Sequence, residues 1–402
     1  MTTDGGSDER KAASQLTEEG CDIYCVCHLV QLCVNDVLDR KKSTSCAWPR
    51  SLVQKAHDLV VFVNSHKNTR EALAELTNTK AARSQESGEA TRGYKVLVLD
   101  QDTRWDSELR MMERLVYFDE EIMAMYTTED LGFPDDLAFS RDDFDLLRSM
   151  VQVLLHVREF TKFFEQSDVP TLAHVPGRVD DLLSLVSYNT IEPSLTTASP
   201  AVRTAAAEFC KRLSASIKDR FQPFFEEDSL ALAARLFLPG PNRMTFKYFP
   251  LAPGILEAVK QRVVDEISHL RWSVPDSRKP YLNDFAAANL KYGIQLVDTC
   301  SPDTDPLDFW SQQKDLAALW PVIRMLLAVP ASSAHAERAF SSAGFTLDEF
   351  RMSLEEENFR REHRLRRYLT AGAPLDSASA FERADRALDL ITEYAATLKE
   401  KH

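Results

Sequence analysis

The sequence predicts a mostly helical protein, and composition and apolar periodicity both indicate this fold class. Only 12 of the 402 residues are glycine, and the composition is rich in Ala, Leu, Glu and Arg, which favour helices. Apolar residues recur at spacings of three and four along much of the chain, as they do on one face of a helix. A length of 402 residues allows two or three domains with full cores.

The charge and the cysteine content limit the class of partner and the compartment. A net charge of −14 and a pI near 5.2 disfavour DNA binding by the chain as a whole, because binding phosphates requires clustered Lys and Arg. DNA is therefore expected to bind weakly, through a local basic patch. The seven cysteines are an odd number and no secretory segment is present, which indicates a reducing compartment, nuclear or cytoplasmic. No apolar stretch approaches 18 residues, so we expect a soluble protein and no membrane partner.

Apolar spacing predicts individual helices in the first three quarters of the chain. A polar stretch at 77–92 is interpreted as a flexible loop and the apolar run Val96–Leu99 as a buried strand. His57 is expected to be a surface residue. The predicted helices cover Leu52–Val63, Leu146–Phe163, Val179–Tyr188, Val202–Phe221, Leu230–Phe237 and, at the end, Ser379–Leu398.

The segment PASSAHAERAFSSAG, residues 330–344, carries the most specific pattern in the sequence. Pro330 ends the preceding element, Ser332 or Ser333 can cap a new helix, and Gly344 suits the turn after it. Glu337 and Arg338 lie one turn into this helix. By themselves these two residues indicate no more than a solvated ion pair on an amphipathic helix.

In order and residue type this segment resembles the C-terminal signature of the hAT (hobo/Ac/Tam3) transposases. The resemblance extends from about Pro306 to Leu369 and includes Trp320-Pro321 before the signature and Arg351 after it. In that family the Glu of the signature is the third carboxylate of an RNase H-like active site. The resemblance therefore makes Glu337 a candidate catalytic residue, with Arg338 in support.

Two segments nearer the N-terminus resemble other hAT elements. Asp4 follows a short strand-like run, where the family carries its second catalytic carboxylate. Cys25-Val-Cys-His28 is similar to the family's Cys-x-x-His element, which makes Cys25 and His28 supporting residues. Arg104 and Trp105, at the entrance of a predicted helix, match a pair that supports the active site in the family.

The early cysteines allow two interpretations. Four thiols and one imidazole within thirteen residues could bind zinc, but their spacing matches no known finger. Free cysteines commonly pack as small apolar side chains. We favour packing and predict no metal here.

The resemblance implies a mostly α fold with a partial RNase H-like α/β core, which is split by a long helical insertion and lacks its first strands. The expected limits are 1–117 for the partial RNase H-like segment, 118–300 for the insertion, 301–372 for the dimerisation region and 373–402 for a C-terminal helix.

Catalysis of the family's type takes three carboxylates and two divalent metal ions. The first carboxylate lies upstream of the segment that Asp4 resembles, and the chain begins three residues before Asp4. We therefore expect an N-terminally truncated, non-catalytic hAT-derived protein that acts by dimerisation. The alternative is the C-terminal part of an active cut-and-paste transposase that uses Mg²⁺ or Mn²⁺; a helical scaffold for other proteins is a third interpretation. No other cofactor is expected.

The predicted partner is a second copy of the chain. The C-terminal third is dense in large apolar side chains, more than one helical hairpin can bury, and such clusters anchor interfaces. The expected dimerisation residues are Trp310, Leu319, Trp320, Ile323, Leu327 and Phe340.

Overall fold

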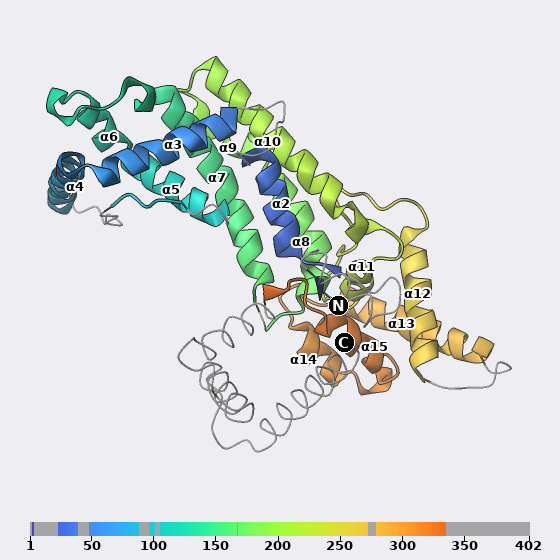
Figure 1. The fold of residues 1–402 in the computed structure, drawn as a ribbon. Coiled ribbons are helices and arrows are strands. Elements are labelled where there is room, and N and C mark those ends of the chain that lie inside the picture. The colour runs from blue at the N-terminus through green and yellow to red at the C-terminus, as the bar shows by residue number, and fades with distance from the viewer. Residues whose placement is uncertain are drawn as a thin grey trace, which may run out of the picture. The chain divides into compact units, whose positions relative to one another are not determined.

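The computed structural model of the chain describes residues 2–3, 23–38, 48–87, 96–100, 105–166, 168–271 and 279–334 (Figure 1). The chain divides into two compact units, Met1–Ser333 and Ala334–His402. All described residues except Ala334 belong to the first unit, which is mostly helical as predicted. Among the described helices, none is long and apolar enough to cross a bilayer.

The elements of the first half are two short strands and a series of helices. The strands pair in parallel, with Thr2 opposite Ile23 and Thr3 opposite Tyr24. The partial RNase H-like α/β core stays a prediction, because this two-stranded pair is the whole sheet within the described residues. The elements are β1 (Thr2–Thr3), β2 (Ile23–Tyr24), α2 (Val26–Leu38), α3 (Trp48–Ser65), α4 (Lys67–Ser87), α5 (Trp105–Tyr117), α6 (Asp119–Tyr126), η1 (Glu129–Leu131), η2 (Asp135–Leu137) and α7 (Arg141–Phe164).

Helix α7 lies at the centre of a group of helices formed with α2, α5, α8 and α10 (Figure 1). It buries apolar side chains on several faces, from Phe144 near its start to Phe164 at its end. A capping box fixes its beginning: Ser140 Oγ accepts from the Asp143 N–H at 3.1 Å, and Asp143 Oδ2 accepts from the Ser140 N–H at 2.9 Å. The remaining elements are α8 (Thr171–Leu185), α9 (Tyr188–Ile191), η3 (Glu192–Leu195), α10 (Pro200–Phe221), η4 (Gln222–Phe225), α11 (Leu230–Arg235), α12 (Ile255–Arg271), α13 (Lys279–Asp298), α14 (Pro306–Gln312), η6 (Lys314–Leu316) and α15 (Trp320–Ala328).

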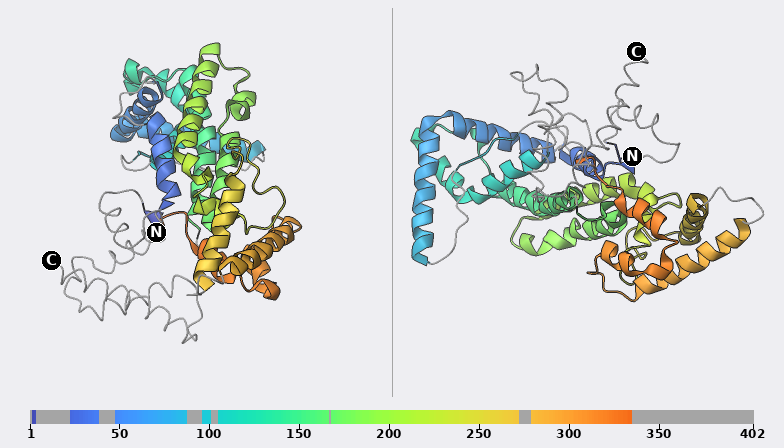
Figure 2. Two further views of the ribbon diagram at one scale, coloured as in Figure 1. Left: turned by 90° about the vertical axis from the view of Figure 1, so that its right-hand side faces the viewer. Right: turned by 90° about the horizontal axis from the view of Figure 1, so that it is seen from below.

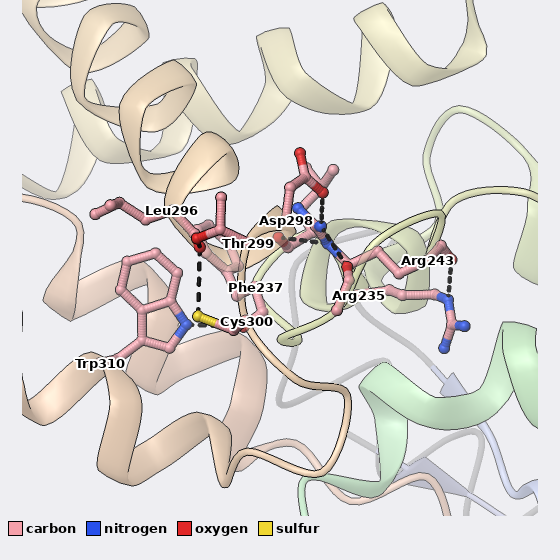
Figure 3. A network of polar contacts seen from close by, with 10 residues as sticks. Arg235, Phe237, Arg243, Leu296, Asp298, Thr299, Cys300 and Trp310 are labelled. Atoms are coloured by element: carbon pink, nitrogen blue, oxygen red, sulfur yellow. Dashed lines mark hydrogen bonds and ion pairs between the residues drawn. The ribbon is translucent and has the colours of Figure 1, made fainter.

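Two arginines connect α8, α11 and α13 (Figure 3). Arg235 Nε donates to the Arg243 carbonyl at 2.6 Å, and a Cβ at position 177 of α8 would lie 2.3 Å from the Arg235 guanidinium. Gly177 therefore makes room for this side chain. Arg243 donates to the carbonyls of Leu236 and Gly240 and forms an ion pair with Asp298 at the end of α13. The loop after α11 is thus bound to Arg235 at the end of α11 and to Asp298 at the end of α13.

Trp310 of α14 is packed inside the same region. Its side chain is 1% exposed, and its indole N–H donates to the Phe237 carbonyl at 2.7 Å (Figure 3). A Cβ at Gly293 of α13 would lie 3.1 Å from both Trp310 and Leu319. The absence of a side chain at position 293 lets α13 and α14 approach closely.

Two predictions about local structure are wrong. The polar stretch 77–92, predicted to be a loop, is helical in its described part, because α4 runs from Lys67 to Ser87 (Figure 2). Leu73 anchors the helix, and the Lys, Ala, Arg, Gln and Glu that follow have high helix propensity. Val96–Leu99 forms no strand: Leu97 is buried, whereas Val96 and Leu99 are exposed.

Replacement of Trp310 tests this packing. We expect Trp310→Ala to lower the free energy of unfolding by about 3–5 kcal/mol, because it leaves a cavity and an unpaired Phe237 carbonyl. Trp320→Ala is the matched control and should cost less than half as much, since Trp320 is only half-buried. Urea denaturation at one protein concentration measures both. Equal losses would contradict the assignment of Trp310 to the core.

Candidate functional site

Three segments that are far apart in the sequence meet at the start of α2. Strand β2 pairs with β1 just before α2 begins. The first N–H of α2, on Val26, donates to the Ala331 carbonyl at 2.9 Å. The predicted carboxylate Asp4 is the residue after β1, and Glu337 follows Ser333 by four residues. Asp4 and Glu337 lie outside the described residues, but the segments that lead to them meet at α2.

The segment Ala331–Ser333, which we name the docked segment, is held by two helices. The Ala331 N–H donates to Thr171 Oγ1, at the start of α8, at 2.9 Å. The Ser333 N–H donates to Cys25 Sγ at 3.3 Å, and Ser332 Oγ lies 3.7 Å from the same sulfur. All three residues of the docked segment are buried. The first part of the hAT-like signature is therefore fixed to α2 and α8.

Cys25 is the N-terminal cap of α2. Its carbonyl accepts from the Leu29 N–H at 2.9 Å, and its sulfur accepts from the backbone N–H of His28. A cap acceptor at this position satisfies an N–H group that the helix leaves unpaired. These contacts involve the Cys25 sulfur and the His28 backbone, and the part that Cys25 plays in a functional site stays a prediction. The His28 side chain is half-buried, and its role stays a prediction.

The pKa values of the neighbouring thiols Cys25 and Cys27 are shifted in opposite directions. The Cys27 thiol donates to the Cys25 sulfur and is the main cause that lowers the pKa of Cys25 to about 5; burial opposes this shift, and the Ser333 N–H adds to it. The same contact raises the pKa of Cys27 far above its ordinary range. Cys27 Sγ also lies 3.8 Å from the Thr161 carbonyl, but a thiolate is the stronger acceptor. The group is thus a buried thiolate with several donors.

A metal is not needed to explain the contacts of these two cysteines. No group of three or more Cys, His, Asp or Glu side chains is placed to hold a metal ion within the described residues. Cys21 and Cys46 lie outside those residues, so the absence of zinc stays a prediction.

The predicted Arg104-Trp105 pair is only partly described. Trp105 is the first residue of α5 and is buried, which is consistent with a bracing role at the helix start. Arg104 lies outside the described residues, as do Arg338 and Phe340. The part that Arg104 and Arg338 play in a site stays a prediction.

A histidine–aspartate pair between α3 and the segment 96–100 was missed by sequence reasoning. His57 Nδ1 of α3 lies 2.5 Å from Asp100 Oδ1; the Asp100 side chain is 0% exposed and that of His57 24%. A buried carboxylate needs such a partner. The expectation that His57 is a plain surface residue is therefore wrong. A carboxylate at the end of an apolar run was the available signal, but nothing in the sequence indicated which residue would meet it.

Four of the six residues expected to form a dimer interface are core residues of one chain. Trp310, Leu319, Ile323 and Leu327 are almost fully buried. Trp320 is half-buried, and the Arg324 guanidinium lies 5.4 Å from its ring. Neighbouring helices of the same chain bury the large apolar side chains of α14 and α15. These side chains therefore do not require a second copy of the chain to be buried.

The ionisation of Cys25 predicts a pH-dependent stability. Because the folded pKa is depressed from 9.0 to about 5, the stabilisation is complete above pH 9 and is lost as the pH falls toward 5. We expect the loss of unfolding free energy in Cys25→Ser to be larger at pH 8.5 than at pH 5.5, measured by urea denaturation.

Cys210→Ser on α10 is the control for this experiment. Burial raises the pKa of Cys210 to about 11, so its contribution changes only as the pH rises from 9 toward 11. Its effect should be equal at pH 5.5 and 8.5. A Cys25→Ser effect that is likewise equal at both values would refute the thiolate.

Two protein-family models match the chain. Residues 23–153 match the ZBED1 RNase-like helical domain, and residues 291–361 match the hAT family C-terminal dimerisation region. A search of curated proteins found no match. The first match contains Cys25 and the start of α2, and the second contains α14, α15 and the docked segment, so the contacts at Cys25 join the two matched regions. These two matches support the identification of the chain as an hAT-family, transposase-like protein.

Proposed function

We propose that this hAT-family protein acts by self-association through its C-terminal third. The observation that carries the proposal is the match of residues 291–361 to the dimerisation region. The described part of that region, from α13 to the docked segment, has its own buried side chains, with Trp310 at the centre. A region that is already packed before association loses little conformational entropy when it binds a partner.

Contacts at both ends of this part attach it to the other helices. At its beginning Asp298 pairs with Arg243, and Trp310 donates to Phe237. At its end the docked segment is bound by Thr171 and Cys25. Association of two copies would therefore also fix the start of α2 relative to the interface.

We also propose that the chain alone does not cleave DNA. A two-metal site of the family's type takes three carboxylates, and the resemblance assigns two of them here, Asp4 and Glu337.

Metal-dependent DNA strand transfer is the second candidate function. It is favoured by one observation: β1, which precedes Asp4, and the docked segment, which precedes Glu337, meet at the start of α2. In that case a further carboxylate comes from another chain or from sequence upstream.

Self-association is tested by the mass of the full chain in solution. We expect a dimer at tens of micromolar in light scattering after size exclusion, because an interface with a Kd of about 1 μM, or roughly −8 kcal/mol, is mostly formed at that concentration. Dilution below 0.1 μM, followed by sedimentation, should show dissociation. A full-length chain that is monomeric at 50 μM would refute the proposed function.

Catalysis is tested with DNA that carries terminal inverted repeats. We expect no nicking or joining by the purified chain in Mg²⁺ or Mn²⁺, on sequencing gels, for the wild type and for Glu337→Gln alike. Metal-dependent cleavage by the wild type that Glu337→Gln abolishes would establish the transposase function instead.

A further inference from the structure

One face of α13 presents two large aromatic side chains to solvent. Phe285, Ala288, Tyr292 and Gln295 follow one another at spacings of three and four, which places them on one side of the helix; we name them the α13 stripe. Phe285 and Tyr292 are each 52% exposed, and Ala288 and Gln295 are exposed as well. These four residues form a largely apolar surface nearly three turns long, with the two aromatic side chains two turns apart.

The orientation of this stripe is fixed by the buried face of the same helix. Ala286, Leu290 and Val297 are buried, and Gly293 lies against Trp310 and Leu319. Helix α13 also packs on α12 (Figures 1 and 2). With these residues in the core, the stripe cannot turn inward without breaking the packing of Trp310.

We propose that two copies of this chain associate through the α13 stripe, antiparallel about a two-fold axis near Ala288. This inference rests on the proposed function, self-association, and identifies the surface that performs it. Tyr292 lies within residues 291–361, which match the dimerisation region, and Phe285 is two turns before Tyr292 on the same face. The interface is therefore continuous with the matched region, but it is formed by exposed residues and not by Trp310.

The spacing of the residues in the α13 stripe is compatible with an interface of two-fold symmetry. In an interface of this symmetry, residue i of one copy meets residue j of the other, and j meets i. Phe285 and Tyr292 lie at equal distances on either side of the 288–289 position, so antiparallel helices place Phe285 of each copy beside Tyr292 of the other. Aromatic pairs of this kind anchor interfaces. Ala288 at the centre is small enough for the two helices to approach.

The charges beside the stripe also favour a second copy as the partner. Asp284 and Lys291 are exposed, lie two turns apart and border the same side of the stripe. Antiparallel pairing brings Lys291 of each copy near Asp284 of the other. Since the chain carries a net charge of −14, two copies repel each other except where their charges balance. A nucleic acid would instead require an excess of Lys and Arg.

The first test removes the aromatic side chains from the full-length chain. We expect Tyr292→Ser and Phe285→Ser each to raise the Kd of the dimer at least tenfold in sedimentation equilibrium, with unchanged circular dichroism and thermal unfolding. Leu185→Ser is the matched control, because Leu185 is 41% exposed and lies on α8, outside the α13 stripe. It should leave the Kd unchanged.

The second test exchanges charges and does not depend on apolar truncation. Lys291→Glu should weaken the dimer, because it places two acids together at each end of the interface. The double variant Asp284→Lys with Lys291→Glu should restore the wild-type Kd. Weakening without restoration would overturn the antiparallel arrangement.

The outcomes separate the two proposals. A wild-type dimer that is unaffected by the Tyr292, Phe285 and Lys291 variants would refute the α13 interface and leave self-association standing. A wild-type chain that is monomeric at 50 μM would refute the proposed function itself.

Discussion

The burial of the docked segment is the constraint on which the described structure depends. Ala331, Ser332 and Ser333 are removed from water, and buried backbone groups need hydrogen-bond partners. The partners come from two separate places: the Val26 N–H and Cys25 sulfur at the start of α2, and Thr171 Oγ1 at the start of α8. Since α2 and α8 both pack on α7, the position of the signature segment and the arrangement of the central helices are determined together.

The helices were largely predictable because their information is local. Apolar periodicity located α3, α7, α8, α10 and α11. The failure at α4 has a physical cause. Its second half has few apolar residues, so periodicity gave no signal, and intrinsic propensity together with the anchored first half extends the helix. Similarly, Val96–Leu99 is apolar enough for a strand, but a strand needs a paired neighbour, which no local pattern indicates.

The candidate site was predictable only as a set of separate residues. The resemblance selected Cys25, but nothing in the sequence placed its sulfur on the Ser333 N–H, 308 positions away. The same limit applies to Trp310, which is buried within this chain. A dense aromatic cluster predicts burial but does not say whether the covering atoms come from the same chain or from a partner. Here the Phe237 carbonyl, 73 positions earlier, and Gly293 supply the answer.

Helix α13 shows how one element can contribute to both the core and an interface. Its inner face uses small residues, Ala286 and Gly293, so that the bulky Trp310 can fit against the helix. Its outer face carries Phe285 and Tyr292, each 52% exposed, at positions where polar residues are usual on a surface helix. Apolar area left in water forgoes roughly 25 cal/mol per Å². Covering these two aromatic side chains with a second surface would therefore be favourable. In the proposed dimer, the same face of α13 in a second copy is that surface, and its two aromatic side chains have the same spacing.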